Sequence, residues 1–424
     1  MAEFRSPIGT RDVLAPESHR WEALVVAFGR AAERAGYGMI LTPLFEDLAV
    51  FQRVGESTDV VRKEMYDFED KGGRQMALRP EVTASVVRAF IQHRPTVPWK
   101  AWYVGPNFRY ESPQAGRFRQ FYQLGVEAIG SADADLDVEV IVLGWRFYAD
   151  LGLRRVSLSL NSLGDDTCRP AYRQALLRYL DLRRSELCDE HKARLEDNPL
   201  RVLDCKKPEC VAATEDAPRQ LDHLCEPCSA HFERVKAGLE SLGVPYRIDT
   251  RLVRGLDYYT RTTFEYAADA LETAQNAIGG GGRYDGLVEE MGGPSTPAIG
   301  FALGVERILL ACDVEGVLPA TGAGPDVFVV DFAGGAAARD LTFALRDAGL
   351  RADRAFDNRS PKSQFKAADR SGARLALVVG PDEAAAGTVS IKDLRAGAGG
   401  GQDAVAVTDL VDEVRRRLSA LSEP

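Results

Sequence analysis

Apolar residues recur at three- and four-residue steps near the start of the chain, and the pattern changes further along. From Glu17 to Gly36 this spacing predicts an amphipathic helix that packs one face on a core. Between residues 99 and 130 the pattern is strand-like in two runs, 101–110 and 121–129, separated by a polar loop that contains glycine. The two runs predict an antiparallel hairpin with a long tip.

The remainder of the chain shows two further changes of pattern. From about residue 166 to residue 246 the sequence is helical, charged and rich in cysteine, which predicts an inserted helical module. A stretch of glycine, proline and alanine at 316–325 has the composition of a linker. Beyond it, short apolar runs alternate with helical stretches, which predicts a compact α/β domain. We therefore expect a first domain over residues 1–320, which contains the insertion, and a second over 325–424.

The composition narrows the class of protein. The chain has 424 residues, of which 45% are hydrophobic, and a net charge of −10. This excludes a disordered chain, and the acidity argues against a protein that coats DNA non-specifically. One basic stretch stands out, because seven basic and three acidic side chains give residues 351–374 a local charge of +4. No apolar run is long enough for a membrane helix and the first residues lack a secretory signal, so we expect a cytoplasmic chain with no membrane partner.

Period-two alternation places chemistry on one face of the predicted hairpin. In the second arm, Gln123, Gly125 and Glu127 share a face, and the glycine leaves room for something small. By the same rule Arg109 and Glu111 share a face of the first arm. Alternating polar residues more often mark a solvated sheet face, and periodicity alone favours that interpretation.

The hairpin loop adds two arginines to this face. Arg117 and Arg119, together with Arg109, provide three guanidinium groups that could converge on phosphates, or could be surface charges. Phe121, just beyond them, could stack on a base or lie in the core. Further along, the glycine run 279–282 lacks the ending of a P-loop, and a close backbone approach to a ligand explains it better.

The seven cysteines fit reduced thiols rather than a disulfide framework, and five of them crowd into about 40 residues of the insertion. Two sets of four zinc-type ligands can be drawn from the spacing, with a shared pair of thiols. One set is Cys188, His191, Cys225 and Cys228, and the other is Cys205, Cys210, Cys225 and Cys228. Thiols that are buried and bind no metal are the alternative that we favour over a structural zinc ion.

Taken in order, the motifs resemble the signature motifs of the class II aminoacyl-tRNA synthetases. Two peptides are similar to those peculiar to the histidyl-tRNA synthetase family, namely Leu252–Tyr259 and the glycine run that ends at Asp285. The segments that resemble the other motifs are Gly9–Asp12, Leu41–Glu46, Phe108–Glu127 and Gly300–Arg307. The resemblance covers nearly the whole chain, including a C-terminal segment similar to the family's anticodon-binding domain.

The resemblance implies an α+β fold and an enzyme. The fold is a class II antiparallel sheet, of the seven-stranded type, with flanking helices, an inserted helical module and a C-terminal α/β anticodon-binding domain. The activity is the ATP-dependent attachment of L-histidine to histidine tRNA through a histidyl-adenylate, with release of AMP and pyrophosphate. The resemblance also implies Mg²⁺ with the ATP, and a homodimer formed through the 41–46 region.

The same resemblance implies a role for individual residues. The expected catalytic arginines are Arg109 and Arg254 at the α-phosphate of ATP and Arg307 at its γ-phosphate. Glu111 is expected at the adenine amino group and Phe121 against the ring, so the ATP-binding residues are Arg109, Glu111, Arg117, Phe121 and Arg307. The expected histidine-binding residues are Glu81, Thr83, Arg109, Gln123, Glu127, Arg254, Tyr258 and Tyr259. The expected tRNA contacts are Gln114, Arg117 and Arg119 at the acceptor end and Arg359 and Lys362 in the anticodon-binding domain.

Two other functions remain open. One is the synthetase-like regulatory subunit of ATP phosphoribosyltransferase, which shares the catalytic fold but typically lacks the C-terminal domain and catalytic residues. This chain keeps Arg109, Glu111, Arg254 and Arg307 and has about 100 residues after the linker. The other is a class II synthetase for a different amino acid, against which the peptide 254–259 argues.

Overall fold

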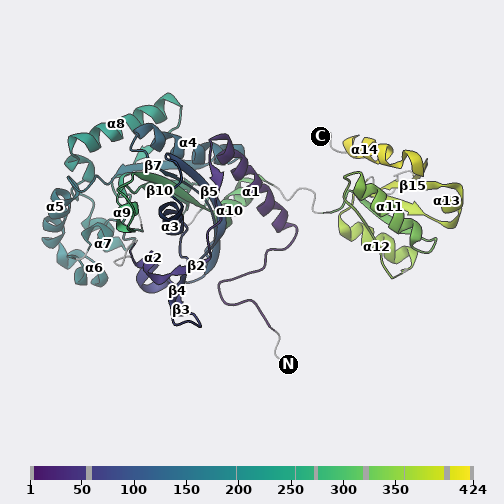
Figure 1. Ribbon diagram of the computed structural model, residues 1–424, viewed down its shortest axis with the longest axis horizontal. Helices are drawn as coiled ribbons and strands as arrows, with labels where there is room; N and C mark the ends of the chain where they lie inside the picture. Colours follow the sequence, from purple (N-terminus) through teal and green to yellow (C-terminus); the bar gives the residue numbers. More distant parts are fainter. Residues whose placement is uncertain are drawn as a thin grey trace. The chain divides into compact units, whose positions relative to one another are not determined.

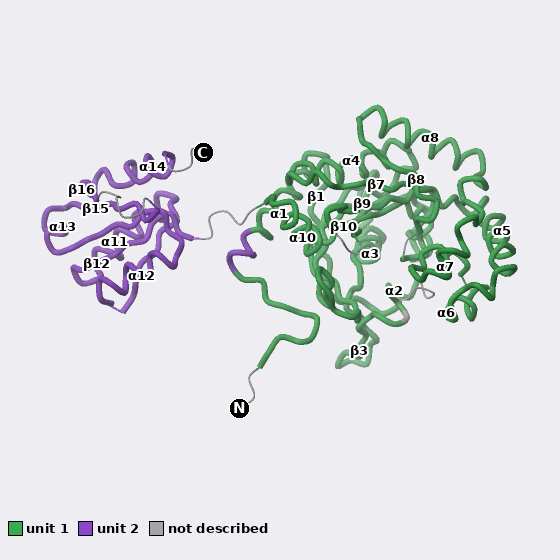
Figure 2. Tube along the Cα trace, turned by 180° about the vertical axis from the view of Figure 1, so that it is seen from behind, with its two compact units in different colours: residues 1–14, 20–319 green, residues 15–19, 320–424 purple. Residues whose placement is uncertain are grey.

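The computed structural model describes residues 4–53, 60–196, 198–253, 255–271, 276–318, 324–357, 359–395 and 402–420. The chain forms two compact units, which Figures 1 and 2 show. The first unit is Met1–Leu14 with Arg20–Pro319, and the second is Ala15–His19 with Ala320–Pro424. None of the described helices is both long and apolar enough to cross a membrane.

An eight-stranded sheet organises the first unit, in the order β1-β5-β6-β11-β10-β9-β7-β8. Its six central strands are antiparallel, and the two-residue edge strands β1 and β8 pair in parallel with their neighbours. The sheet thus has one strand more than expected, because of these short edges. The strands are β1 (Gly38–Met39), β5 (Trp99–Phe108), β6 (Gln120–Ile129), β7 (Val156–Ser162), β8 (Arg247–Ile248), β9 (Thr260–Ala268), β10 (Ala277–Arg283) and β11 (Ala298–Gly304).

Helices cover the two faces of this sheet differently. The predicted amphipathic helix is present as α1 (Glu17–Arg34), and its buried Leu24 and Phe28 join a large apolar core with α4 (Ala134–Asp150) and α10 (Val305–Glu315). A separate core lies around α3 (Thr83–His93) and α9 (Leu287–Glu290), and it contains several tyrosines. The tyrosines of this second core are Tyr258, Tyr259 and Tyr284, which come from segments far from α3 in the sequence.

A small three-stranded sheet precedes α3 in the chain. Its order is β2-β4-β3, and all its pairs are antiparallel. Its strands and the short helices beside them are β2 (Phe45–Asp47), α2 (Leu48–Gln52), the π-helix η1 (Val60–Glu64), β3 (Tyr66–Glu69) and β4 (Gln75–Leu78).

Glycines allow the central strands of the large sheet to pack closely. Residue Gly300 of β11 pairs with Glu127 of β6. A Cβ atom on Gly300 would lie 1.8 Å from the Glu127 carboxylate, and one on Gly281 would lie 2.0 Å from the Gly300 carbonyl oxygen. Any side chain at these two positions would displace the carboxylate or the neighbouring strand.

The predicted insertion is a run of helices between β7 and β8, at the edge of the sheet (Figure 1). It has its own apolar core, in which Tyr172, Leu176 and Leu180 are buried. Its elements are α5 (Arg169–Asp181), η2 (Arg184–Glu186), α6 (Asp189–Ala193), η3 (Pro199–Val202), α7 (Pro208–Ala213), η4 (Gln220–His223) and α8 (Glu226–Ser241).

The second unit has the α/β organisation that the sequence predicts. Its five-stranded sheet has the order β13-β12-β14-β15-β16, with parallel pairs on both sides of β12 and antiparallel pairs beyond β14. The strands are β12 (Val327–Asp331), β13 (Ala352–Arg354), β14 (Leu375–Val379), β15 (Thr388–Asp393) and β16 (Gln402–Ala406). The helices are α11 (Ala336–Asp347), α12 (Pro361–Ser371), α13 (Pro381–Ala386), η6 (Val407–Asp409) and α14 (Leu410–Ala420).

Candidate active site

Two adjoining pockets open on the face of the large sheet that carries the predicted site residues. The outer pocket has about 190 Å³ of space, and Glu111, Arg117, Phe121 and Arg307 line it. The inner pocket has about 150 Å³, which is the space of about five water molecules and suits a small molecule. Its wall includes predicted residues from three different elements, namely Glu81, Thr83, Gln123, Glu127, Tyr258 and Tyr259. The walls of both pockets share Arg109, Gln123, Gly280 and Ala302.

Arg109 holds the boundary between the two pockets. Its Nε donates a hydrogen bond to the Pro80 carbonyl oxygen at 2.9 Å, and its guanidinium carbon lies 5.2 Å from the centre of the Phe121 ring. These contacts fix a permanent positive charge where a ligand of the outer pocket meets a ligand of the inner pocket.

The outer pocket is rich in arginine. Glu111 and Arg117 form an ion pair across it, and Arg307, at the start of α10, donates to the Ala277 carbonyl oxygen. Burial and the neighbouring Arg117 lower the pKa of Arg307, although Glu265 and Glu111 oppose the change. The wall also holds three glutamates, so its net charge is balanced, and the pocket suits a ligand that offers phosphates to the guanidinium groups and cationic or N–H groups to the carboxylates.

The inner pocket is built around the buried carboxyl group of Glu127, which is 1% exposed. Its Oε1 accepts hydrogen bonds from the hydroxyls of Thr83 at 2.6 Å and Tyr103 at 3.3 Å, and its Oε2 accepts one from Tyr284 at 2.5 Å. Burial raises the pKa of Glu127 to about 8, and the hydrogen bonds limit that rise. A pKa of about 8 favours the protonated carboxyl group at neutral pH, in which form one of its oxygens donates to a neighbouring hydroxyl instead of accepting from it.

A second buried carboxylate begins helix α3. Glu81 accepts hydrogen bonds from the backbone N–H groups of Thr83 at 2.6 Å and Ala84 at 2.8 Å. Burial raises its pKa, and these hydrogen bonds oppose the change. Glu81 thus satisfies two backbone N–H groups at the start of α3, and it also lines the inner pocket.

Two aromatic rings from the 252–259 peptide complete the inner pocket. Tyr258 and Tyr259 are both buried, with their ring centres 4.6 Å apart, and the ring of Tyr258 meets that of Tyr284 at 5.7 Å. Arg254, from the same peptide, lies outside the described residues, so its expected place at the site stays a prediction.

The structure corrects three expectations for the hairpin. Its polar face is not solvated, because α3 and the tyrosines cover Glu127. The space above Gly125 is not free for a ligand, because the Tyr103 ring would lie 2.3 Å from a Cβ atom there. The three arginines do not converge, because Arg119 lies over the Tyr110 ring at 3.9 Å and donates to the Glu111 carbonyl oxygen.

Residues that sequence reasoning missed contribute much of the inner pocket. Tyr103 reaches Glu127 from the neighbouring strand, where it pairs with Gly125, and Tyr284 reaches it from the end of β10. Tyr103 could have been found from the register of β5 against β6. Predicting that register requires knowing where the hairpin loop begins and ends. Of the glycine run, Gly279 and Gly280 line the pockets, whereas Gly281 lies too close to β11 to do so.

The residues expected to contact tRNA lie in two places. Gln114 and Arg117 form an isolated bridge in the hairpin loop, next to the outer pocket. In the second unit, Arg359 is exposed and lies 3.5 Å from Asp357, and Lys362 is exposed in the first turn of α12.

The cysteines group differently from either expected set. Neither set that was drawn from the spacing forms, because Cys225 and Cys228 lie with Asp165 and the unconsidered Cys168. Cys188 and His191 from one expected set lie instead with Cys205 and Cys210 from the other. The order of ligands along a chain does not decide which short helices meet, and the insertion folds Cys205 and Cys210 back onto α6.

Two family models match the chain. The model described as histidyl-tRNA synthetase matches residues 9–308, and the model described as anticodon binding domain matches residues 326–417. Among curated relatives, the histidine–tRNA ligase of Halothermothrix orenii is 47% identical over 98% of this chain and 99% of its own. That of Corynebacterium kroppenstedtii is 50% identical over 99% of this chain and 98% of its own.

Solved structures agree with these matches. The apo histidyl-tRNA synthetase of S. aureus has a TM-score of 0.81 and 36% identity, covering 97% of this chain and 100% of that one. The histidyl-tRNA synthetase of Nostoc sp. has a TM-score of 0.72 and 25% identity, covering 98% and 100%. The chain therefore belongs to the histidyl-tRNA synthetase family of class II aminoacyl-tRNA synthetases, and it is a ligase that attaches histidine to tRNA with ATP.

Proposed function

We propose that the outer pocket binds ATP and the inner pocket binds histidine, so that the two substrates meet at Arg109. The observation that carries this assignment is the shared wall of the two pockets. The arginine-rich outer pocket suits a triphosphate, and the enclosed inner pocket suits an amino acid. A carboxylate from one side and an α-phosphate from the other would both lie against the same guanidinium group.

The first chemical step needs alignment more than it needs a base. The histidine carboxylate oxygen attacks the α-phosphorus, an oxygen–phosphorus bond forms, and the bond to the bridging oxygen breaks to release pyrophosphate. A carboxylate is already ionised at neutral pH, so no side chain has to remove a proton. In this assignment Arg109 neutralises charge at the α-phosphate and Arg307 holds the γ-phosphate, and Arg254 is expected beside Arg109.

The walls of the outer pocket fit the rest of ATP. Phe121, which lies beside Arg109, supplies a ring for the adenine to stack on, and Glu111 supplies an acceptor for its amino group. Mg²⁺ with the β- and γ-phosphates fits the same pocket because Glu265 of β9 supplies a carboxylate there. The ion, when bound with ATP, would add positive charge on the departing pyrophosphate.

Recognition of histidine rests on the polar groups of the inner pocket. Glu81, Thr83 and Gln123 are assigned to the ammonium group, and Glu127, Tyr258 and Tyr259 to the imidazole. The Glu127 carboxylate accepts three hydrogen bonds within the protein, and a substrate without ring nitrogens would leave its fourth acceptor position without a donor. An unpaired buried polar group costs roughly 1–3 kcal/mol, which is how such a pocket rejects an apolar amino acid of the same shape.

The second step transfers the histidyl group to tRNA. The terminal ribose hydroxyl of the tRNA attacks the carbonyl carbon of the adenylate, and AMP leaves. The hairpin loop with Gln114, Arg117 and Arg119 is assigned to the acceptor end, because it borders the ATP pocket. The second unit is assigned to the anticodon, in keeping with its match to anticodon-binding domains.

A homodimer is part of the proposal. The region expected to form the dimer interface exposes apolar side chains, since Leu41 is 75% exposed and Phe45 is 53% exposed. Exposed apolar groups that lie close together commonly mark a surface that is covered in the assembled protein.

The assignment is tested by exchange of labelled pyrophosphate into ATP, measured with each of the twenty amino acids and without tRNA. We expect exchange with histidine alone, and a loss of about 100-fold or more for Arg109→Gln. Arg119→Gln is the matched control, because Arg119 lies outside both pockets, and it should keep the exchange but lose tRNA charging. Exchange that survives in Arg109→Gln contradicts the shared-boundary assignment. No exchange with any amino acid, in a folded protein, would point to the regulatory paralogue instead.

A further inference from the structure

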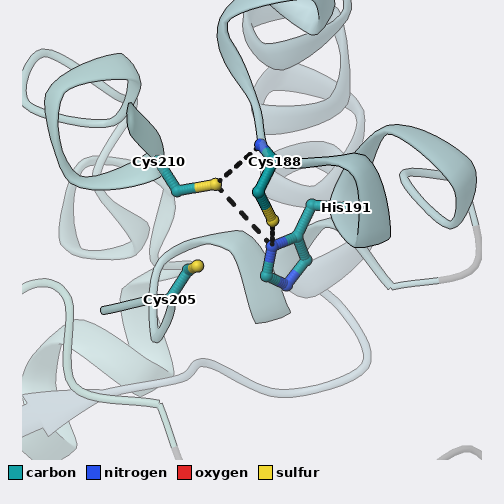
Figure 3. A group of neighbouring side chains, drawn as sticks. All are labelled: Cys188, His191, Cys205 and Cys210. Carbon is teal, nitrogen blue, oxygen red and sulfur yellow. Dashed lines mark hydrogen bonds between the residues drawn. The ribbon is translucent and has the colours of Figure 1, made fainter. Parts of the chain in front are cut away.

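Four metal-type ligands converge in the insertion module, away from both pockets. The Sγ atoms of Cys188, Cys205 and Cys210 and a ring nitrogen of His191 all lie within 4.8 Å of one another. Figure 3 shows the three thiols and the imidazole directed toward the same space. The Nδ1 atom of His191 lies 3.1 Å from the Sγ of Cys188 and 3.7 Å from that of Cys210. Tetrahedral zinc bonds of about 2.3 Å to sulfur and 2.05 Å to nitrogen place such atoms about 3.6 Å apart.

The chemistry of the donors also fits zinc. Three thiolates and one imidazole are among the common ligand sets of structural zinc sites. The backbone N–H of Cys188 donates to the Sγ of Cys210 at 3.3 Å, which is the type of outer contact that supports and orients a metal-bound sulfur.

The elements that carry the ligands are short, so a cross-link would matter for their stability. Cys188 immediately precedes α6, a helix of five residues that contains His191. Cys210 lies in α7, a helix of six residues, and Cys205 lies between η3 and α7. Isolated helices shorter than about 12 residues are marginal in water, and a metal that joins three such pieces would supply the missing stabilisation.

The second group of candidate ligands is less suited to a metal. Its carboxylate, that of Asp165, already accepts hydrogen bonds from the Thr167 N–H at 3.0 Å and from Arg261 Nη2 at 3.3 Å. The Sγ atoms of Cys168 and Cys225 lie 3.5 Å and 3.6 Å from the same carboxylate oxygen, within hydrogen-bond reach. Because both oxygens of the Asp165 carboxylate already accept hydrogen bonds, internal hydrogen bonds account for this group.

The elements around the first cluster hold the peptide that walls the inner pocket. Arg201 of η3 donates to the Gly255 carbonyl oxygen at 3.2 Å, and Asn198 donates to Asp257 at 3.4 Å. In the other direction, Arg251 donates to the carbonyl oxygens of Leu203 at 3.1 Å and Val211 at 3.4 Å. The segments that carry Cys205 and Cys210 are thus bonded on both sides to the peptide that leads into Tyr258 and Tyr259.

We propose that Cys188, His191, Cys205 and Cys210 bind one zinc ion, and that this ion fixes η3 and α7 so that they hold residues 251–253 and 255–257 against the inner pocket. The ion has a structural role and takes no part in the reaction. The link to histidine rests on the assignment of the inner pocket made above, whereas the binding of zinc does not.

Metal analysis of three full-length proteins tests the proposal. The proteins are the unmodified chain, Cys205→Ser, and the matched control Cys225→Ser, which alters another partly buried thiol, in the second group. They are expressed with added zinc, purified under reducing conditions without chelator, and their bound metal is measured by mass spectrometry. We expect Cys205→Ser to contain about one zinc ion per chain fewer than the unmodified protein, and Cys225→Ser to contain the same amount.

Two further measurements use the same proteins. Cobalt added to chelator-treated, unmodified chain should give the visible absorption of a tetrahedral thiolate site, and Cys205→Ser should not give that spectrum. Histidine-dependent pyrophosphate exchange should show a higher KM for histidine in Cys205→Ser than in Cys225→Ser, with the KM for ATP unchanged.

The outcomes separate the parts of the proposal. Less than about 0.1 zinc per chain in the unmodified protein, or loss of zinc in Cys225→Ser but not in Cys205→Ser, would overturn the metal site. Zinc that depends on Cys205 with an unchanged KM for histidine would overturn the link to the inner pocket and keep the site. Absence of exchange in every protein, with zinc present, would count against the assignment of the pockets and leave the metal site supported.

Discussion

The buried carboxyl group of Glu127 sets the pH behaviour of the inner pocket. Three hydroxyls surround it, and no lysine or arginine among the described residues forms an ion pair with it. Burial therefore dominates, and the pKa of about 8 means that at neutral pH Glu127 must lose a proton to offer an anionic carboxylate. An imidazole N–H or a cationic group of the substrate binds the anion better than the neutral acid.

We predict that the KM for histidine falls as the pH rises from 7 to about 8 and levels off above it. The slope should approach about tenfold per pH unit below the pKa, because one proton is released on binding. Glu127→Gln imitates the protonated group, so its KM should be high and flat over the same range. Histidine-dependent pyrophosphate exchange between pH 7 and 9 measures both. A variant with the same pH profile as the unmodified chain would show that another group titrates.

The same residue shows how far sequence reasoning reaches at this scale. Period-two alternation in the hairpin placed Gln123 and Glu127 on one face, and the structure places both in the wall of the inner pocket. Alternation could not show that this face is buried, because burial depends on α3 and on Tyr284, which is more than 150 residues away. Long-range packing, and not the local alternation, therefore determines that this face of the hairpin is buried.

At the scale of elements, a buried ion pair joins the large sheet to the helices behind it. Arg283 at the end of β10 and Asp137 in α4 have fully buried side chains, and the Arg283 Nε donates to Asp137 at 3.0 Å. His231 of α8 lies 2.7 Å from the same carboxylate. Burial alone would raise the pKa of Asp137, but the His231 hydrogen bond and the Arg283 charge lower it below its usual value.

We predict that Asp137→Asn lowers the free energy of unfolding of the first unit by about 3 kcal/mol, because it removes the fully buried counter-charge of Arg283. This is the lower end of the cost of breaking a buried ion pair, since Arg283 keeps its second ion pair, with Asp285 at 3.0 Å. Asp135→Asn is the matched control, since Asp135 is exposed on the same helix and pairs with Arg234 at 3.3 Å. It should change stability by less than about 1 kcal/mol. All four tryptophans lie in the first unit, so urea unfolding followed by tryptophan fluorescence reports on that unit. Equal effects of the two changes would contradict the prediction.

Helices and strands with a strong hydrophobic periodicity could be predicted from the sequence. The elements against which they pack could not. The helix at 17–36 and the hairpin of β5 and β6 are present within a few residues of their expected bounds. The cysteine sets were wrong for a related reason. Cys168 belonged to neither expected set, yet the fold of the insertion places it beside Cys225 and Cys228. Which short elements meet depends on chain reversals that spacing does not encode.

At the scale of the whole molecule, the two pockets and the basic stretch 351–374 belong to different units of the chain. Both pockets lie in the first unit, and the basic stretch 351–374 lies in the second. The count of +4 overstates the charge available to tRNA, because Asp326 lies outside the stretch and pairs with Arg351. The exposed pair Arg359 and Lys362, at the start of α12, therefore carries more of the expected contact with phosphate.

We predict that Arg359→Glu combined with Lys362→Glu weakens tRNA binding and leaves histidine-dependent pyrophosphate exchange intact. Each lost contact with a single-stranded phosphate should reduce the slope of log K against log salt by about 0.7. The matched control reverses Arg339 and Arg415 to glutamate, which makes the same change in net charge on other exposed helices, α11 and α14, of the second unit. Filter binding at several salt concentrations, with exchange measured in parallel, provides both readouts. A similar loss in the control would mean that overall charge, and not this surface, governs binding. A loss of exchange in the double variant would mean that the second unit also supports formation of the adenylate.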